Sequence, residues 1–246
     1  MRDAALFTTT LPGNDDSSVG PVALGFSINF FGLNRSTGFV NNNGNLTFDA
    51  ALGTFTPFPL STTNRQILAP FFADVDTRPA ASLDVTYGAA TLGGKKVFGV
   101  NWIDVGYFSS HVDKLNSFQL IITERADIAA GDFDFEFNYD TITWETGDAS
   151  GGSGGLGGNS ARAGWSNGSV ATYEFSGSAT DGALLNGGAN ALISSSLNSN
   201  VAGRYIFNVR NGAVQPPTGI PEPASLALVA LALVGTGVAS RRKRCC

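Results

Sequence analysis

The fold class is decided by the stretch Asp132-Phe133-Asp134-Phe135-Glu136-Phe137-Asn138-Tyr139. Every second residue in it is aromatic, and the residues between carry carboxyl or amide groups. Successive side chains of a β-strand point to opposite faces, so this spacing predicts a strand with an aromatic face in a core and an acidic face turned outward. Farther along, Ile142 and Trp144 stand at even positions, whereas the aromatic residues stand at odd ones. We therefore expect a bulge or bend near Asp140.

Further strand patterns occur at short intervals along the chain, separated by Gly, Asn and Pro. The expected strands, besides 132–139, are residues 25–31, 38–41, 45–48, 97–105, 117–123, 161–165, 171–175 and 204–209. The segment Asn42-Asn43-Gly44 predicts a tight hairpin turn, because Asn and Gly tolerate positive φ. Residues 181–197 predict a helix or an irregular excursion. The sequence thus predicts an all-β, antiparallel sandwich-like domain.

The composition narrows the classes of function. The chain of 246 residues holds 31 Gly and 18 Phe, 14% of its residues are charged, and its net charge is −5. This apolar content excludes a disordered chain, and an acidic body without clustered cations excludes nucleic acid as a partner. One His, and Cys only at positions 245 and 246, exclude zinc chemistry, thiol chemistry and a disulfide within the body. We expect no resident cofactor, with Ca²⁺ as the one candidate considered below.

The C-terminal end has three parts in order. A Pro-Glu-Pro motif is followed by an uncharged apolar stretch, residues 224–239, and then by four basic residues. As a helix this stretch spans about 24 Å, somewhat less than a hydrocarbon core of about 30 Å. A buried core helix would be apolar on one stripe only, so we expect a single C-terminal transmembrane helix with its basic end in the cytoplasm. The flanking residues are Pro221, Glu222 and Pro223 before it, and Arg241, Arg242, Lys243 and Arg244 after it.

These three parts resemble the bacterial PEP-CTERM sorting signal, which has a Pro-Glu-Pro motif, a hydrophobic helix and an Arg-rich cytoplasmic tail. The resemblance implies export, recognition by an exosortase and processing near residues 221–223. The membrane orientation places residues 1–220 outside the cytoplasm. Because residues 1–7 have no apolar run of signal-peptide length, we expect the natural precursor to begin upstream of Met1.

The body of the chain carries a second resemblance, in blocks that keep one order. The blocks are residues 30–32, 39–44, 67–78, 100–107, 116–120, 137–139 with Trp144, 163–165 and 203–207. In this order they resemble the NIDO domain, the extracellular domain of nidogen and related adhesion proteins. The resemblance implies extracellular placement and cell–matrix adhesion, and it supplies no catalytic residues. The expected divisions are an N-terminal segment 1–19, a NIDO-like domain 20–210, a linker 211–220 and the sorting signal 221–246.

Asp74 and Asp76 form the cluster that most suggests chemistry. Residues two apart on a strand share a face, so these carboxylates are close enough to share a cation such as Ca²⁺. Arg78 stands on the same face and could neutralise them instead. Two interpretations stay open, a cation site and a structural ion pair.

Asp132, Asp134 and Glu136 offer a candidate glycan site. Their spacing resembles the Glu-x-Asp-x-Glu strand of laminarinase-like glycoside hydrolases, in which two carboxylates act as nucleophile and general acid. The short Asp132 stands where that pattern has Glu. Positions 132 and 136 are about 13 Å apart along a strand, whereas retaining hydrolases hold their carboxyl groups about 5 Å apart. The alternative is a solvated acidic face opposite an aromatic core.

Together these patterns predict a non-enzymatic, exported surface or extracellular-matrix protein of a Gram-negative bacterium. We expect a membrane-anchored precursor that an exosortase processes into the outer envelope or the extracellular matrix. Its expected role is cell–matrix adhesion or the assembly of exopolysaccharide in a biofilm, with extracellular polysaccharide or surface proteins as partners. The alternative is a polysaccharide-binding or laminarinase-like, glycan-hydrolysing β-sandwich.

Overall fold

The alternating aromatic stretch forms strand β10 (Phe133–Thr141) in the computed structural model, which describes residues 1–216. The three Phe side chains of β10 have no exposed surface, as the alternation predicts. The register of β10 against its neighbour β9 (His111–Glu124) shifts beside Asp140. This shift confirms the predicted bulge, and Ile142 is buried beyond it.

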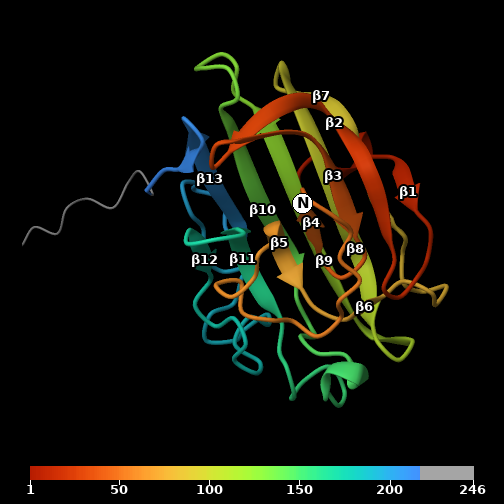
Figure 1. The fold of residues 1–246 in the computed structure, drawn as a ribbon. Coiled ribbons are helices and arrows are strands. Elements are labelled where there is room, and N and C mark those ends of the chain that lie inside the picture. The colour runs from red at the N-terminus through yellow and green to blue at the C-terminus, as the bar shows by residue number, and fades with distance from the viewer. Residues whose placement is uncertain (217–246) are drawn as a thin grey trace, which may run out of the picture. The chain divides into compact units, whose positions relative to one another are not determined.

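Two antiparallel sheets contain the strands of the described residues (Figure 1). The larger sheet has the order β1 (Thr9–Leu11), β7 (Val85–Leu92), β8 (Lys95–Tyr107), β9, β10, β13 (Arg204–Arg210) and β14 (Ala213–Val214), with β6 (Val75–Asp76) paired to β8. The smaller sheet has the order β12 (Thr172–Glu174), β11 (Arg162–Asn167), β5 (Gln66–Phe72), β4 (Asn45–Thr47), β3 (Leu33–Asn41) and β2 (Ser18–Phe30). The helices of residues 1–216 are two short 3₁₀ turns, η1 (Ala4–Leu6) and η2 (Asp148–Ser150). The all-β prediction is therefore confirmed for this part of the chain.

The core lies between the two sheets and is rich in aromatic rings. Phe30 of β2 meets Phe133 of β10, with ring centroids 6.1 Å apart. Phe71 of β5 meets Phe118 of β9 at 5.3 Å. Each pair joins the smaller sheet to the larger one, so the sheets pack face to face as the predicted sandwich. Burial of such large apolar side chains is the main stabilising contribution to this domain. Both Cys residues of the chain lie outside the described residues.

A buried polar turn, residues 41–45, connects β3 to β4. Gly44 has φ +73°, which confirms the predicted positive-φ hairpin turn. The sequence did not indicate that the Asn side chains of this turn are buried, yet Asn41, Asn42, Asn43 and Asn45 have no exposed surface. Each buried amide needs hydrogen-bond partners, because leaving one unpaired costs about 1–3 kcal/mol.

The buried polar turn fixes the place where the chain crosses between the sheets. After β5 the chain passes through residues 73–74 into β6, which belongs to the larger sheet. Asn42 Nδ2 donates to the carbonyl of Val75 at 2.5 Å and to that of Asp15 at 2.6 Å. Asn43 Oδ1 accepts from the Val75 N–H at 2.9 Å. The turn therefore holds both the crossing and the segment between β1 and β2.

The structure extends the domain beyond the bounds expected from the sequence. β1 adds residues before position 20 to the edge of the larger sheet, and β14 adds residues that were expected in the linker. β14 forms a hairpin with β13, whereas β1 pairs with β7, which is distant in the sequence. The local composition indicated neither pairing. Residues 181–197 form turns and no helix, in agreement with the irregular alternative.

The predicted transmembrane helix 224–239 lies outside the described residues, as do the sorting residues 221–223 and 241–244. Residues 1–216 contain no helix with the length and apolar character needed to cross a membrane.

Gly44→Ala should lower the free energy of unfolding by at least about 3 kcal/mol. A Cβ at position 44 would lie 1.7 Å from the carbonyl oxygen of Phe71, and φ is +73°. Gly93→Ala is the matched control, because Gly93 has φ +57° but no atom within 4 Å of the added Cβ. It should cost only about 1 kcal/mol. Urea unfolding followed by Trp fluorescence measures both, and equal losses would contradict the close approach of the turn to β5.

Candidate functional site

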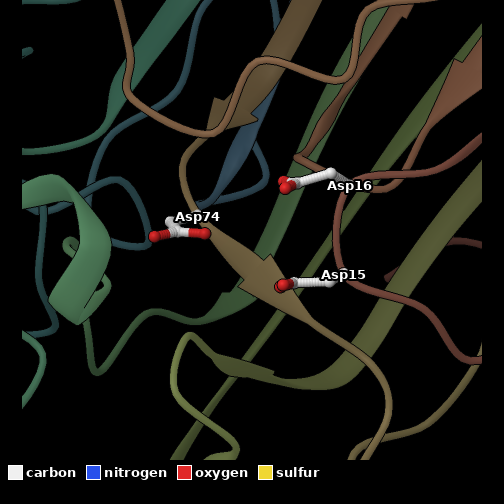
Figure 2. A group of neighbouring side chains, drawn as sticks. All are labelled: Asp15, Asp16 and Asp74. Atoms are coloured by element: carbon white, nitrogen blue, oxygen red, sulfur yellow. The ribbon is translucent and has the colours of Figure 1, made fainter.

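Three aspartates from two chain segments meet beside the crossing between the sheets. Asp15 and Asp16 belong to the loop between β1 and β2, and Asp74 lies between β5 and β6. One carboxylate oxygen of each lies within 4.8 Å of the others. Figure 2 shows the three side chains reaching toward a shared space from opposite sides. We call these three residues the acidic cluster.

Asp76 is not part of the acidic cluster, because Arg78 neutralises it. Arg78 Nη2 lies 2.6 Å from Asp76 Oδ2, and Nε donates to Oδ1 at 2.9 Å. The Ser110 N–H donates to Oδ2 at 2.9 Å. Burial alone would raise the pKa of Asp76, but the hydrogen bonds from Arg78 and Ser110 outweigh it and lower the pKa. The sequence suggests Asp74 and Asp76 together as candidate cation ligands. The structure separates them, because Asp76 is held in an ion pair and Asp74 is not.

Asp74 is the member of the acidic cluster whose carboxylate has neither a cation nor a hydrogen-bond donor beside it among the described residues. It is 1% exposed, and neither carboxylate oxygen has a hydrogen-bond partner among the described residues. Burial, followed by the negative charges of Asp15 and Asp16, raises the pKa of Asp74 to about 7. Gly147 packs so closely that a Cβ there would lie 2.5 Å from Asp74 Oδ2. A proton or a cation entering the cluster would therefore stabilise this carboxyl group.

Asp15 and Asp16 are held by neighbours that leave oxygen atoms available. Arg78 Nη2 lies 3.2 Å from Asp15 Oδ2, whereas Asp15 Oδ1 has no hydrogen-bond partner within residues 1–216. Asn43 Nδ2 donates to Asp16 Oδ1 at 2.8 Å. Burial, followed by the negative charges of Asp76 and Asp16, raises the pKa of Asp15 to about 6. A set of carboxylate oxygens suits a hard cation such as Ca²⁺.

Sequence reasoning missed Asp15 and Asp16. Their only local signal is a pair of adjacent acidic residues just before a strand, a pattern that is common on protein surfaces. Their proximity to Asp74 follows from the buried polar turn, whose contacts join segments far apart in the chain.

The acidic face of β10 is covered by arginine side chains. Asp134 contacts Arg125 Nη1 and Arg210 Nη2, each at 2.6 Å. Glu136 pairs with Arg2 Nη1 at 3.0 Å. Arg125 directly follows β9, whereas Arg2 and Arg210 come from distant parts of the chain. All three lie over the face that alternation turns away from the core.

The expectation that this acidic face is solvated is wrong. Asp132 and Glu136 are only 3% and 4% exposed, because the arginine side chains cover them. Asp132 Oδ1 accepts from the Asn211 N–H at 2.9 Å. The glycan site at Asp132, Asp134 and Glu136 stays a prediction, and each of its carboxylates already has a cationic or N–H partner.

A cleft of about 250 Å³ lies between the end of β12 and the irregular segment that precedes β13. Its lining combines the rings of Tyr173, Phe175 and Tyr205 with Ser and Asn residues. Tyr173 is 38% exposed, so one of these rings is open to solvent. An exposed ring beside hydroxyl and amide groups offers both stacking and hydrogen bonding to a small ligand.

The two raised pKa values predict that stability depends on pH in buffer that contains a chelator. The ordinary pKa of Asp is 3.8, against about 7 for Asp74 and about 6 for Asp15. Between these values the folded state binds more protons than the unfolded state, so the free energy of unfolding falls as pH rises. We expect the melting temperature to fall by about 5 °C between pH 5 and pH 8, as measured by scanning calorimetry.

Asp74→Asn removes the carboxyl group whose pKa is shifted more. The melting temperature of this variant should therefore change less over the same range of pH. Asp140→Asn, which removes an exposed carboxylate from the β10 bulge, should keep the slope of the unsubstituted chain. An equal slope in the Asp74→Asn variant would show that other groups cause the pH dependence.

Comparison with known protein families gives two matches along the chain. The nidogen-like domain matches residues 36–92 and 80–211. The PEP-CTERM protein-sorting motif matches residues 219–244. Both resemblances that the sequence indicated are confirmed.

Similar proteins include alpha-tectorins and a nidogen. Alpha-tectorin of Homo sapiens is 34% identical over 237 residues, which cover 86% of this chain and 10% of alpha-tectorin. Alpha-tectorin of Gallus gallus is 32% identical over 234 residues, covering 85% of this chain and 10% of its own length. Nidogen of Drosophila melanogaster is 27% identical over 235 residues, covering 85% of this chain and 16% of its own length.

The chain therefore spans about a tenth of the length of the alpha-tectorins that it matches. No solved structure matches it. The family match nevertheless covers more than half of the chain and most of both sheets. On this basis the chain belongs to the nidogen-like domain family, and its C-terminal end carries a PEP-CTERM sorting motif.

Proposed function

We propose that this protein is a non-enzymatic, exported protein of the surface or extracellular matrix of a Gram-negative bacterium. Its nidogen-like domain mediates cell–matrix adhesion or the assembly of exopolysaccharide in a biofilm. The observation that carries this proposal is the order of two matches on one chain, a nidogen-like domain that ends at residue 211 and a PEP-CTERM motif over residues 219–244. An adhesive domain followed by a sorting motif suits delivery to the outside of the cell.

In this proposal each part of the C-terminal end has a role. The basic residues 241–244 remain in the cytoplasm, as excess positive charge does beside a membrane segment. The apolar residues 224–239 hold the precursor in the membrane. An exosortase recognises residues 221–223 and processes the chain nearby. The nidogen-like domain then leaves the membrane and enters the outer envelope or the matrix.

The contacts of β10 favour a binding role over hydrolysis of glycans. Glycoside hydrolysis needs two carboxyl groups, one that gives a proton and one that acts as nucleophile or base. Asp134 lies between two guanidinium groups, and Glu136 pairs with Arg2. These ion pairs already occupy both carboxylates, which suits a structural role rather than catalysis.

Replacing Pro221, Glu222 and Pro223 with alanine tests the proposed function. In a host with an exosortase, we expect the unsubstituted chain in the outer envelope or the medium, and the variant as a longer precursor in the membrane fraction. Because adhesion requires delivery, attachment of cells to a surface should fall to the level of cells without the gene. Immunoblots of the cell fractions and a dye-binding attachment assay measure the two effects.

A matched control replaces Pro216 and Pro217, the neighbouring proline pair, with alanine. This variant should be processed and should support attachment like the unsubstituted chain. Normal release of the variant at residues 221–223 would contradict the sorting mechanism. Normal attachment by cells that retain the precursor would contradict the adhesive role of the released domain.

A second candidate function is binding of a polysaccharide at the cleft beside Tyr173. The specific observation in its favour is the exposed ring of Tyr173 beside Ser and Asn residues in a cleft of about 250 Å³. A sugar ring that stacks on this side chain could also bond to the hydroxyl and amide groups nearby. In this role the domain would still act by binding and would carry no hydrolytic activity.

Tyr173→Ala should lower the affinity for exopolysaccharide about tenfold, since one aromatic contact contributes about 1 kcal/mol or more. Leu33→Ala is the control, because Leu33 is also exposed and does not line the cleft. A glycan array followed by calorimetry on the purified chain measures binding. Equal affinity in the two variants would exclude this cleft, and release of reducing sugar from β-glucans would contradict the non-enzymatic assignment.

A further inference from the structure

We propose that Asp15, Asp16 and Asp74 bind one calcium ion, which joins the N-terminal segment to the crossing between the two sheets. This inference goes beyond the proposed function, because it depends neither on sorting nor on adhesion. It also differs from the pair of ligands that the sequence suggests, since Asp76 is bound by Arg78.

The spacing of the acidic cluster fits a calcium ion. Calcium binds oxygen at about 2.4 Å, so two oxygen ligands on opposite sides of the ion are about 4.8 Å apart. One oxygen of each carboxylate in the cluster lies within 4.8 Å of the other two. A single ion between them can therefore contact all three carboxylates, as their orientation in Figure 2 indicates.

Asp74 provides an independent reason to expect a cation. The residue is only 1% exposed, and both of its carboxylate oxygens lack a hydrogen-bond partner in the described part of the chain. Burying a carboxylate without a partner is costly, and proteins normally supply a cation or hydrogen bonds. The neighbouring cation, Arg78, contacts Asp76 and Asp15 instead. A bound metal ion supplies the positive charge that Asp74 lacks.

The ligand set favours calcium over other common cations. All three ligands are carboxylates, which excludes the nitrogen and sulfur donors that zinc prefers. Magnesium usually binds through one or two carboxylates and keeps several waters in a strict octahedron. Calcium takes six to eight oxygens in flexible geometry, so three carboxylates, one or more of them bidentate, and water complete its coordination.

The surrounding residues position the ligands before any ion binds. Asn43 Nδ2 holds Asp16 Oδ1 at 2.8 Å, and Asn42 Nδ2 holds the carbonyl of Asp15 at 2.6 Å. Both amides belong to the buried polar turn, which also fixes Val75 next to Asp74. The ion therefore adds a link between two segments that the turn already brings together, and its binding should stabilise the whole domain.

Calcium titration of the full chain, purified in detergent and freed of metal with a chelator, tests the site. Calorimetry should detect one Ca²⁺ per chain, and the melting temperature should rise by several degrees at saturating Ca²⁺. The same concentration of Mg²⁺ should raise it much less. Asp74→Asn should weaken Ca²⁺ binding at least about tenfold. In metal-free buffer at pH 8 this variant should melt at or above the temperature of the unsubstituted chain, because a buried charge is removed.

Asp140→Asn serves as the control for charge, and it should keep full Ca²⁺ binding. Asp16→Asn provides a second ligand variant that retains an oxygen for Asn43, and it is judged in the same way if Asp74→Asn fails to fold. If Ca²⁺ gives the unsubstituted chain neither binding heat nor a higher melting temperature, the proposal is overturned. The buried charge of Asp74 would then be removed by protonation. The proposal would also be overturned if Ca²⁺ raised the melting temperature of Asp74→Asn as much as that of the unsubstituted chain. The same holds if Mg²⁺ stabilised the unsubstituted chain as much as Ca²⁺ does.

Discussion

The buried polar turn, residues 41–45, is the constraint on which the rest of the fold depends. Its amide side chains have no access to water, so each must find its partners within the protein. Two of them bond to Val75 and to residues 15–16, and these bonds tie the N-terminal segment to the crossing between the sheets. Gly44 permits the arrangement, because its positive φ and its missing side chain let the turn lie directly against β5.

The same turn explains why negative charge gathers at the crossing. By holding residues 15–16 in place, it brings two carboxylates beside Asp74 although like charges repel. At Asp76 the repulsion is offset by two short contacts with Arg78. At Asp74 residues 1–216 place no such group, so the fold of this part creates a position where a cation or a proton is stabilising. The packing of the sandwich around the acidic cluster offsets the free-energy cost of bringing these charges together.

Elsewhere the domain balances its acidic side chains by pairing them. Arginines from three segments, two of them distant in the chain, cover the acidic face of β10 and hold Asp134 and Glu136 in ion pairs. The carboxylates on the acidic face of β10 are paired with arginines, whereas Asp74 in the acidic cluster has no such partner among the described residues. This contrast agrees with a domain that acts through binding, because the carboxylates arranged like those of a hydrolase are the ones already occupied.

The sequence by itself determined the β10 strand, its bulge near Asp140, the positive-φ turn at Gly44, and both family resemblances. These features depend on neighbouring residues, whose spacing and backbone preferences are written along the chain. Only the tertiary structure decided the burial of the Asn side chains, the arginine cover over β10 and the meeting of residues 15–16 with Asp74. Each of these joins segments far apart in the chain, and no local pattern records which distant group will lie within a hydrogen bond or a few ångströms of another once the sheets pack.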